Sequence, residues 1–179
     1  KVMEEPVDLE RQIERDFVRN GTFLDVDIAD SYGLKASETR AERVFVSFER
    51  FRGYLGERIA EHNGRVLNSN GDEIMAFFDR AGDAVSCARA MQMGLRNWNV
   101  RDNLLEREFR VRIGVHTGEA QERGGDYFGP AVNRAARIMS AGHGGQVLIS
   151  EASVGLVSRD GLVALGEYRL KDLQGPERL

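Results

Sequence analysis

The apolar residues of this chain follow two different spacings, which predicts helices in some stretches and strands in others. In residues 37–63 they recur every three or four positions, the spacing that places side chains on one face of an amphipathic helix. Helical spacing also covers residues 81–98 and, after a proline in the first turn, residues 130–141. In residues 109–119 apolar and polar residues alternate instead, which is typical of a strand with one buried face.

Shorter apolar runs predict the remaining strands. They lie at residues 21–28, 64–69, 73–78, 144–150 and 164–173. The second and third runs flank Asn70-Gly71-Asp72, and Asn and Gly tolerate the positive φ that a tight hairpin requires. No repeat or low-complexity tract interrupts this order. We therefore predict an α/β (α+β) sandwich in which helices pack on a single sheet.

A separate amphipathic pattern occupies residues 7–18, where Leu9, Ile13 and Phe17 fall on one helical stripe. Such a helix either packs on its own domain or connects it to an upstream module. Because the chain begins with Lys rather than Met, we expect a fragment boundary here. We divide the chain into an N-terminal connector helix, residues 1–20, and one globular domain, residues 21–179.

Composition narrows the classes of function. The chain of 179 residues is 41% hydrophobic and 30% charged, as in soluble domains, and no apolar run approaches the roughly 18 residues that cross a bilayer. A net charge of -4 argues against a broad nucleic-acid-binding surface. The single cysteine, Cys87, lies in a helical pattern and is predicted to be a core residue. Its lack of a disulfide partner favours a reducing compartment, so we expect a cytoplasmic protein or cytoplasmic domain.

Two acidic residues, Asp27 and Asp72, lie where predicted strands end. Brought together they repel each other unless a divalent cation joins them, and Mg²⁺ or Mn²⁺ prefers carboxylates combined with phosphate oxygens. Turn and strand-end aspartates are also common as structural residues, so this pair alone is a weak signal. His62, His116 and His143 show no zinc-binding spacing, and the sequence lacks the serine-hydrolase, P-loop and dinucleotide-binding motifs.

Asn133 and Arg137 lie four positions apart in the predicted 130–141 helix, which follows a glycine-rich loop at residues 123–129. Residues at this spacing share a helix face, so an amide and a guanidinium project together. A transferring phosphoryl group requires such a pair, because the guanidinium offers a fixed positive fork and the amide orients the substrate. A solvated helix face is the alternative interpretation.

Four segments, taken in order, carry a family resemblance. They are FLDVDI, NGDEIMAFF, RVRIGVHTGE and GGDYFGPAVNRAARIMSAGHGGQVLIS. Together they resemble the catalytic domain of bacterial-type class III nucleotide cyclases, the adenylate and guanylate cyclase family, from about residue 22 to 173. The resemblance implies a ferredoxin-like βαββαβ core with extra strands and helices. It also implies attack of a ribose 3′-hydroxyl on the α-phosphate of a nucleoside triphosphate, which gives a 3′,5′-cyclic nucleotide and pyrophosphate.

The resemblance assigns expected roles residue by residue. Asp27 and Asp72 match the two metal-binding aspartates, and the backbone carbonyl of Ile28 would complete the shell of one of two Mg²⁺ or Mn²⁺ ions. Asn133 matches the asparagine that orients the ribose, and Arg137 matches the arginine that stabilises charge on the α-phosphate. In the family these two sets come from different subunits, so we expect a homodimer with two shared sites.

Four further positions concern the substrate. Asn68 stands where adenylate cyclases of the family have a base-reading lysine and guanylate cyclases a glutamate, whereas Asp126 is the residue of the adenylate type. Lys171, in the short motif YRLKDL, matches the lysine that binds the triphosphate in the family. The alternative is that Lys171 is a solvated lysine at the end of a strand. Asp30, where many relatives have glycine, is expected to place a negative charge near the triphosphate and to weaken its binding, unless the side chain points outward or meets a cation.

These residues favour conversion of ATP to cyclic AMP. The same reaction on GTP or a pyrimidine nucleoside triphosphate is an alternative, because the Asn68 amide can both donate and accept a hydrogen bond. A nucleotide-binding regulatory module without turnover is a second alternative. An upstream regulatory domain is an expected partner, whereas nucleic acid and direct membrane insertion are not expected.

Overall fold

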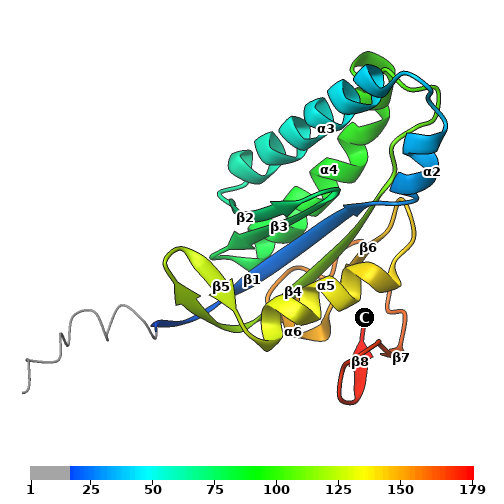
Figure 1. Cartoon of the computed structure of the whole chain (residues 1–179). Coiled ribbons are helices and arrows are strands. Elements are labelled where there is room, and N and C mark those ends of the chain that lie inside the picture. Colours follow the sequence, from blue (N-terminus) through cyan, green and yellow to red (C-terminus); the bar gives the residue numbers. More distant parts are fainter. Residues whose placement is uncertain (1–16) are drawn as a thin grey trace, which may run out of the picture.

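Figure 1 shows the computed structural model of the protein, which describes residues 17–179, so all but the last two residues of the helix predicted over residues 7–18 lie outside the described part. Six strands form one sheet in the order β2-β3-β1-β4-β5, with β6 beside β4. They are β1 (Phe17–Ile28), β2 (Arg65–Asn70), β3 (Glu73–Phe78), β4 (Val111–Arg123), β5 (Asp126–Phe128) and β6 (Val147–Ile149). β6 runs parallel to β4 and the other pairs are antiparallel, so the sheet is mixed. β7 (Glu167–Arg169) and β8 (Pro176–Arg178) form a separate two-stranded sheet.

Helices cover both faces of the large sheet (Figure 1). They are α2 (Ser31–Ala36), α3 (Ala41–Glu61), α4 (Ala81–Arg101), α5 (Pro130–Ala141) and α6 (Glu151–Val154). α3 and α4 pack on one face, and α5 packs on the other. β1, the α2–α3 segment, β2, β3, α4 and β4 follow the predicted βαββαβ order, which confirms the expected mixed α/β core. None of the helices in residues 17–179 is long and apolar enough to span a membrane.

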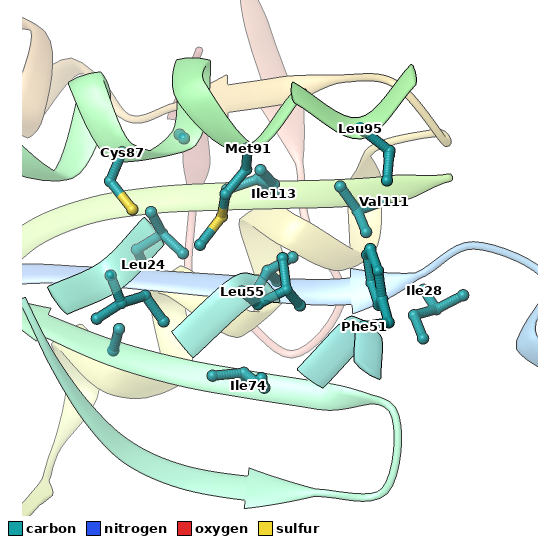
Figure 2. Packing of buried hydrophobic residues seen from close by; sticks show 14 of the residues in the cluster. Leu24, Ile28, Phe51, Leu55, Ile74, Cys87, Met91, Leu95, Val111 and Ile113 are labelled. Carbon is teal, nitrogen blue, oxygen red and sulfur yellow. The ribbon is translucent and has the colours of Figure 1, made fainter. Parts of the chain in front are cut away.

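The buried face of each helix explains its position. Figure 2 shows Phe51 and Leu55 of α3 and Met91 of α4 gathered over Leu24 and Ile28 of β1. A second buried cluster lies under α5. Burying an aliphatic or aromatic side chain of this size contributes about 1.5–3 kcal/mol, so each face of β1 anchors a different helical layer.

The structure corrects the end of the predicted N-terminal helix. Phe17–Asn20, which the sequence placed in the connector helix, belong to β1 instead. These residues pair with β4 from Glu122 to Glu119, so the sheet satisfies their backbone hydrogen bonds. The helix predicted over residues 7–18 is therefore wrong for its last two residues, Phe17 and Val18, and Phe17 is 57% exposed.

Other element boundaries differ from the prediction at turns. The polar break after β1 contains the short helix α2, whose N-cap Asp30 has φ 52° and accepts a hydrogen bond from the Gly33 backbone N–H. The glycine-rich loop contains β5, because β4 extends beyond the predicted end at residue 119 and turns back on itself. Of the strand predicted at residues 164–173, only β7 forms, and it pairs with β8.

A close backbone approach holds α5 against the sheet. A Cβ at Gly114 of β4 would overlap backbone atoms of Ala135 and Met139 in α5. Only glycine leaves room for this contact, since a helix backbone cannot move aside as a flexible side chain does. The position of α5, and with it the position of Asn133 and Arg137, depends on this residue.

Gly114→Ala should lower the free energy of unfolding by about 1–3 kcal/mol, because the added methyl group overpacks the α5 contact. The urea midpoint of the purified domain measures this change. Gly53→Ala is the matched control: Gly53 is exposed in α3 with nothing within 4 Å of an added Cβ. Its replacement should stabilise the helix by about 0.5–1 kcal/mol. Equal effects of the two substitutions would contradict the close-packing argument.

Candidate active site

Two predicted metal-binding residues lie at one end of the central strands. Asp27 is the last residue but one of β1 and pairs with Glu73 of β3. Asp72 directly precedes Glu73 in the β2–β3 turn. The hairpin thus brings Asp72 to the edge of the sheet where β1 presents Asp27 and the Ile28 backbone.

Asp27 forms an ion pair with Arg112 of β4. The Nε and Nη2 groups of Arg112 donate to Asp27 Oδ2 over 3.0 and 2.7 Å. The two residues are direct partners in the β1–β4 ladder, and the Asp27 side chain is 16% exposed. Arg112 Nη1 also donates to the carbonyl of Ser140 over 3.4 Å. The guanidinium therefore links Asp27 to the C-terminal end of α5.

Asp72 has a cationic partner of its own. Lys35 Nζ donates to the two carboxylate oxygens of Asp72 over 2.9 and 2.7 Å. Lys35 lies in the last turn of α2, and its ammonium is 4.8 Å from the ring centroid of Phe48. This contact could not be predicted from the sequence, because the residues are 37 positions apart in the chain and α2 was not predicted. Both predicted metal-binding carboxylates are thus neutralised by protein cations.

The oxygen donors fit a hard divalent cation. Two carboxylates and a strand-end carbonyl are ligands that Mg²⁺ and Mn²⁺ accept, with phosphate oxygens and water completing the shell. Within residues 17–179, no group of three or more His, Cys, Asp or Glu side chains is arranged to hold a metal ion. A metal bound at Asp27 and Asp72 would therefore depend on substrate or water oxygens as well.

Asn133 and Arg137 lie on one side of α5. Four residues of this helix are buried, namely Ala131, Ala135, Ile138 and Met139. Asn133 is exposed and Arg137 is partly exposed, as their spacing predicts. Arg137 Nη2 lies 2.8 Å from Asp172 Oδ2, in an ion pair whose side chains are 40% and 57% exposed. This contact brings the segment that carries Lys171, itself exposed, next to α5.

The two predicted base-reading residues lie on outer strands that approach each other. Asn68 is exposed on β2, and Asp126 is exposed on β5, at the opposite end of the strand order. Tyr127, the neighbour of Asp126, accepts a hydrogen bond from Arg65 of β2 over 2.6 Å. The Tyr127 ring also stacks on Phe77, with ring centroids 4.5 Å apart. The β4–β5 hairpin thus folds back over the sheet toward β2.

Asp30 does not add an unbalanced charge to the site. Its Oδ2 accepts a hydrogen bond from Arg107 Nη2 over 2.9 Å, and its Oδ1 caps α2 at Gly33. The Arg107 hydrogen bond, followed by that from Gly33, lowers the pKa of the Asp30 carboxyl below its usual value. The expected repulsion of the triphosphate by Asp30 is therefore offset by a cation.

Two further titratable residues are part of the core. His116 is buried, its Nδ1 lies 2.7 Å from Ser150 Oγ, and burial lowers its pKa to about 4, so the ring is neutral at pH 7. Cys87 is buried, and burial raises the pKa of its thiol to about 12. The environment of Cys87 agrees with its predicted core role and disfavours a nucleophilic thiolate.

Asp25 is a buried carboxyl that sequence inspection missed. It lies two residues before Asp27, is 0% exposed, and neither of its oxygens has a hydrogen-bond partner among the described residues. Burial and then the neighbouring Glu73 carboxyl raise its pKa to about 8. The segment FLDVDI contains a signal that could have identified it. Asp25 interrupts an apolar strand two residues after Phe23, so the two side chains share a face of the strand.

The comparisons with known proteins establish the family. Residues 19–177 match the model of the adenylate and guanylate cyclase catalytic domain. Because the match covers nearly the whole chain, the protein belongs to the class III nucleotide cyclase family. The family resemblance inferred from the four sequence motifs is confirmed.

Individual relatives agree with this assignment. An uncharacterized protein of Mycobacterium tuberculosis is 41% identical over 130 residues, covering 69% of this chain and 42% of that protein. The putative adenylate cyclase 3 of Rhizobium meliloti is 36% identical over 125 residues, covering 69% of this chain and 21% of that protein. The chain thus spans less than half the length of these two relatives. The crystal structure of the guanylyl cyclase Cya2 has a TM-score of 0.78 and 25% identity, with 91% of each chain covered.

Asp25→Asn should make folding stability less dependent on pH. The folded pKa of about 8 exceeds the ordinary value of 3.8, so the folded state holds its proton more tightly and stability falls as pH rises from about 4 to about 8. The variant should unfold close to wild type at pH 5 and be about 1–3 kcal/mol more stable at pH 8. Thermal or urea unfolding at both pH values measures this.

The control for the Asp25 measurement is Asp79→Asn, because the Asp79 side chain is 76% exposed. It should leave the pH dependence of stability unchanged. If the Asp25 variant showed the wild-type slope between pH 5 and pH 8, the buried carboxyl would not be the titrating group.

Proposed function

We propose that this domain is a nucleotide cyclase that converts ATP to 3′,5′-cyclic AMP and pyrophosphate at sites shared by two copies of the chain. One observation carries the proposal: a single chain of this family presents Asp27 and Asp72 at one strand edge and Asn133 with Arg137 on the outer side of α5. The first set offers oxygen ligands for cations, and the second offers donors for ribose and phosphate. A homodimer would therefore contain two complete sites.

In the proposed reaction the ribose 3′-oxygen forms a bond to the α-phosphorus. The bond from the α-phosphorus to the bridging oxygen of the β-phosphate breaks, pyrophosphate leaves with the electron pair, and the hydroxyl proton passes to water. Mg²⁺ or Mn²⁺, when bound, would lower the pKa of the 3′-hydroxyl and screen the charge of the triphosphate. Asp27, Asp72 and the Ile28 carbonyl would hold the ions, so Arg112 and Lys35 must move off the two carboxylates.

Arg137 has to leave Asp172 to reach an α-phosphate. Both side chains of this pair are substantially exposed, at 40% and 57%. Exposed ion pairs contribute only about 0–1 kcal/mol, so the exchange of Asp172 for a phosphate costs little. In the proposed role, Arg137 stabilises the charge that develops on the α-phosphate, and Asn133 orients the ribose.

The choice of adenine depends on Asp126 and Asn68. The Asp126 carboxylate accepts a hydrogen bond from an exocyclic amine, and the Asn68 amide can donate to adenine N1. The name of the Rhizobium relative supports adenine. The fold does not decide the base, since the guanylyl cyclase Cya2 has the same architecture. GTP is therefore the principal alternative substrate, because the Asn68 carbonyl can also accept from guanine.

A panel of ATP, GTP, CTP and UTP with Mg²⁺ or Mn²⁺ tests the proposed function, with products separated by chromatography. Cyclic AMP should predominate. Asn68→Lys should raise the ATP-to-GTP activity ratio, because a lysine only donates and therefore favours adenine N1. A dominant product other than cyclic AMP would overturn the adenine assignment. Tight ATP binding without any cyclic product would favour the non-catalytic regulatory module.

Mixing two inactive variants tests the shared sites. Asp27→Ala removes a metal ligand, and Arg137→Ala removes a transition-state donor whose loss typically lowers the rate about 10²- to 10³-fold. Each variant alone should be nearly inactive, whereas the mixture should regain part of the activity because a mixed dimer has one intact site. Two variants altered in the same residue set, Asp27→Ala and Asp72→Ala, are the control and should not complement each other. Full activity in a strictly monomeric preparation would contradict the shared site.

A further inference from the structure

Lys35 lies in the proposed catalytic region without a role assigned by the sequence motifs. Its ammonium contacts both oxygens of Asp72 over 2.7 and 2.9 Å, and its side chain is 45% exposed. Asp72 is only 17% exposed in this pair. Asp72 is thus the more buried of the two partners. The Lys35 ammonium covers its carboxylate, which is expected to hold a metal.

The helix that carries Lys35 is fixed on the core, so its backbone is a stable base for a movable side chain. Leu34, the preceding residue, is 2% exposed and belongs to the main core cluster. Asp30 caps the start of α2 and pairs with Arg107. These contacts hold the backbone at one end of the sheet. The four-carbon stem of Lys35 leaves its ammonium free to reorient.

A metal bound at Asp72 must displace this ammonium. The two cations repel each other and compete for the same carboxylate oxygens. Once displaced, the ammonium is held close by the α2 backbone and lacks a carboxylate partner. In the proposed site the triphosphate would supply a new anionic partner, since Mg²⁺ and Mn²⁺ accept phosphate oxygens as well as carboxylates as ligands.

We propose that Lys35 is a triphosphate-binding residue, which leaves Asp72 when metal and nucleotide bind and donates to terminal phosphate oxygens. This inference rests on the proposed function. Charge balance supports it: two divalent ions neutralise a triphosphate but leave the charges of Asp27 and Asp72. The two residues that pair with those aspartates in the free protein, Arg112 and Lys35, carry the matching positive charges.

The experiment measures separately how the Lys35 side chain affects metal binding and triphosphate binding. Lys35→Gln should bind Mn²⁺ more tightly in the absence of nucleotide, because a competing cation has been removed. It should bind a non-hydrolysable ATP analogue with Mn²⁺ about 10-fold or more weakly, the loss expected for a hydrogen bond to a charged group. Electron paramagnetic resonance measures free Mn²⁺, and calorimetry measures the nucleotide. AMP binding should be unchanged, because AMP lacks the terminal phosphates.

Two further variants keep the test decisive. Lys35→Arg should restore triphosphate affinity, since it returns the positive charge. Arg89→Gln removes one positive charge from an exposed position of α4, outside the residues assigned to the site, and should match wild type in every measurement. Melting temperatures establish that each variant is folded. Unchanged affinity of Lys35→Gln for the triphosphate, with or without tighter Mn²⁺ binding, would reduce Lys35 to a partner of Asp72 and overturn the proposal.

Failure of this inference is distinguishable from failure of the proposed function. If the wild type makes no cyclic nucleotide from any triphosphate, the cyclase proposal fails, yet the binding measurements still test Lys35 because they need no turnover. If the wild type is active and KM for the triphosphate is the same in Lys35→Gln, only the inference about Lys35 fails.

Discussion

The pairing of β1 with β4 is the constraint on which the rest of the molecule depends. The ladder runs from Phe17 opposite Glu122 to Ile28 opposite Val111. This register places Asp27 beside Arg112 and leaves Gly114 under α5. Since side chains alternate between the faces of a strand, a shift by one residue would move Asp27 into the apolar layer of α3 and α4. The strand register therefore fixes the site geometry and the core at once.

The second constraint on the proposed site is that its charged side chains already have ion-pair partners, which a substrate would have to replace. Three predicted functional side chains, Asp27, Asp72 and Arg137, each form an ion pair with a residue outside the predicted set. An unpaired charge at a partly buried site costs more than a paired one, so these partners stabilise the free protein. A highly charged substrate with its cations can replace all three partners together. In the metal-free protein, each of these three charges is therefore balanced by a protein partner.

The sequence predicts the core well because periodicity and turn chemistry are local properties. The 81–98 helix and the Asn70-Gly71 turn are recovered with small errors at their ends. The four motifs, taken in order, indicated the family, and the match over residues 19–177 confirms it. Assignments that depended on tertiary pairing were less successful: Phe17–Asn20 read as helix in isolation, but β4 recruits them as strand.

The site was harder to predict than the fold for the same reason. The spacing of Asn133 and Arg137 on one helix is local, so their common orientation could be deduced. Arg112 and Lys35 lie 85 and 37 positions from their acidic partners, and nothing in the linear sequence pairs them.

Burial of these pairs decides which of them resists exchange most. The Asp27–Arg112 side chains are 16% and 32% exposed, compared with 17% and 45% for Asp72 and Lys35. Screening by solvent weakens an ion pair as exposure grows, so the arginine should be the harder of the two cations to displace. Arg112 is also anchored to the Ser140 carbonyl, whereas the Lys35 ammonium has Phe48 as its other close contact. In the proposed function, a metal ion would therefore meet less resistance at Asp72 than at Asp27, so we expect the hairpin carboxylate to be the first contact of a metal–nucleotide complex.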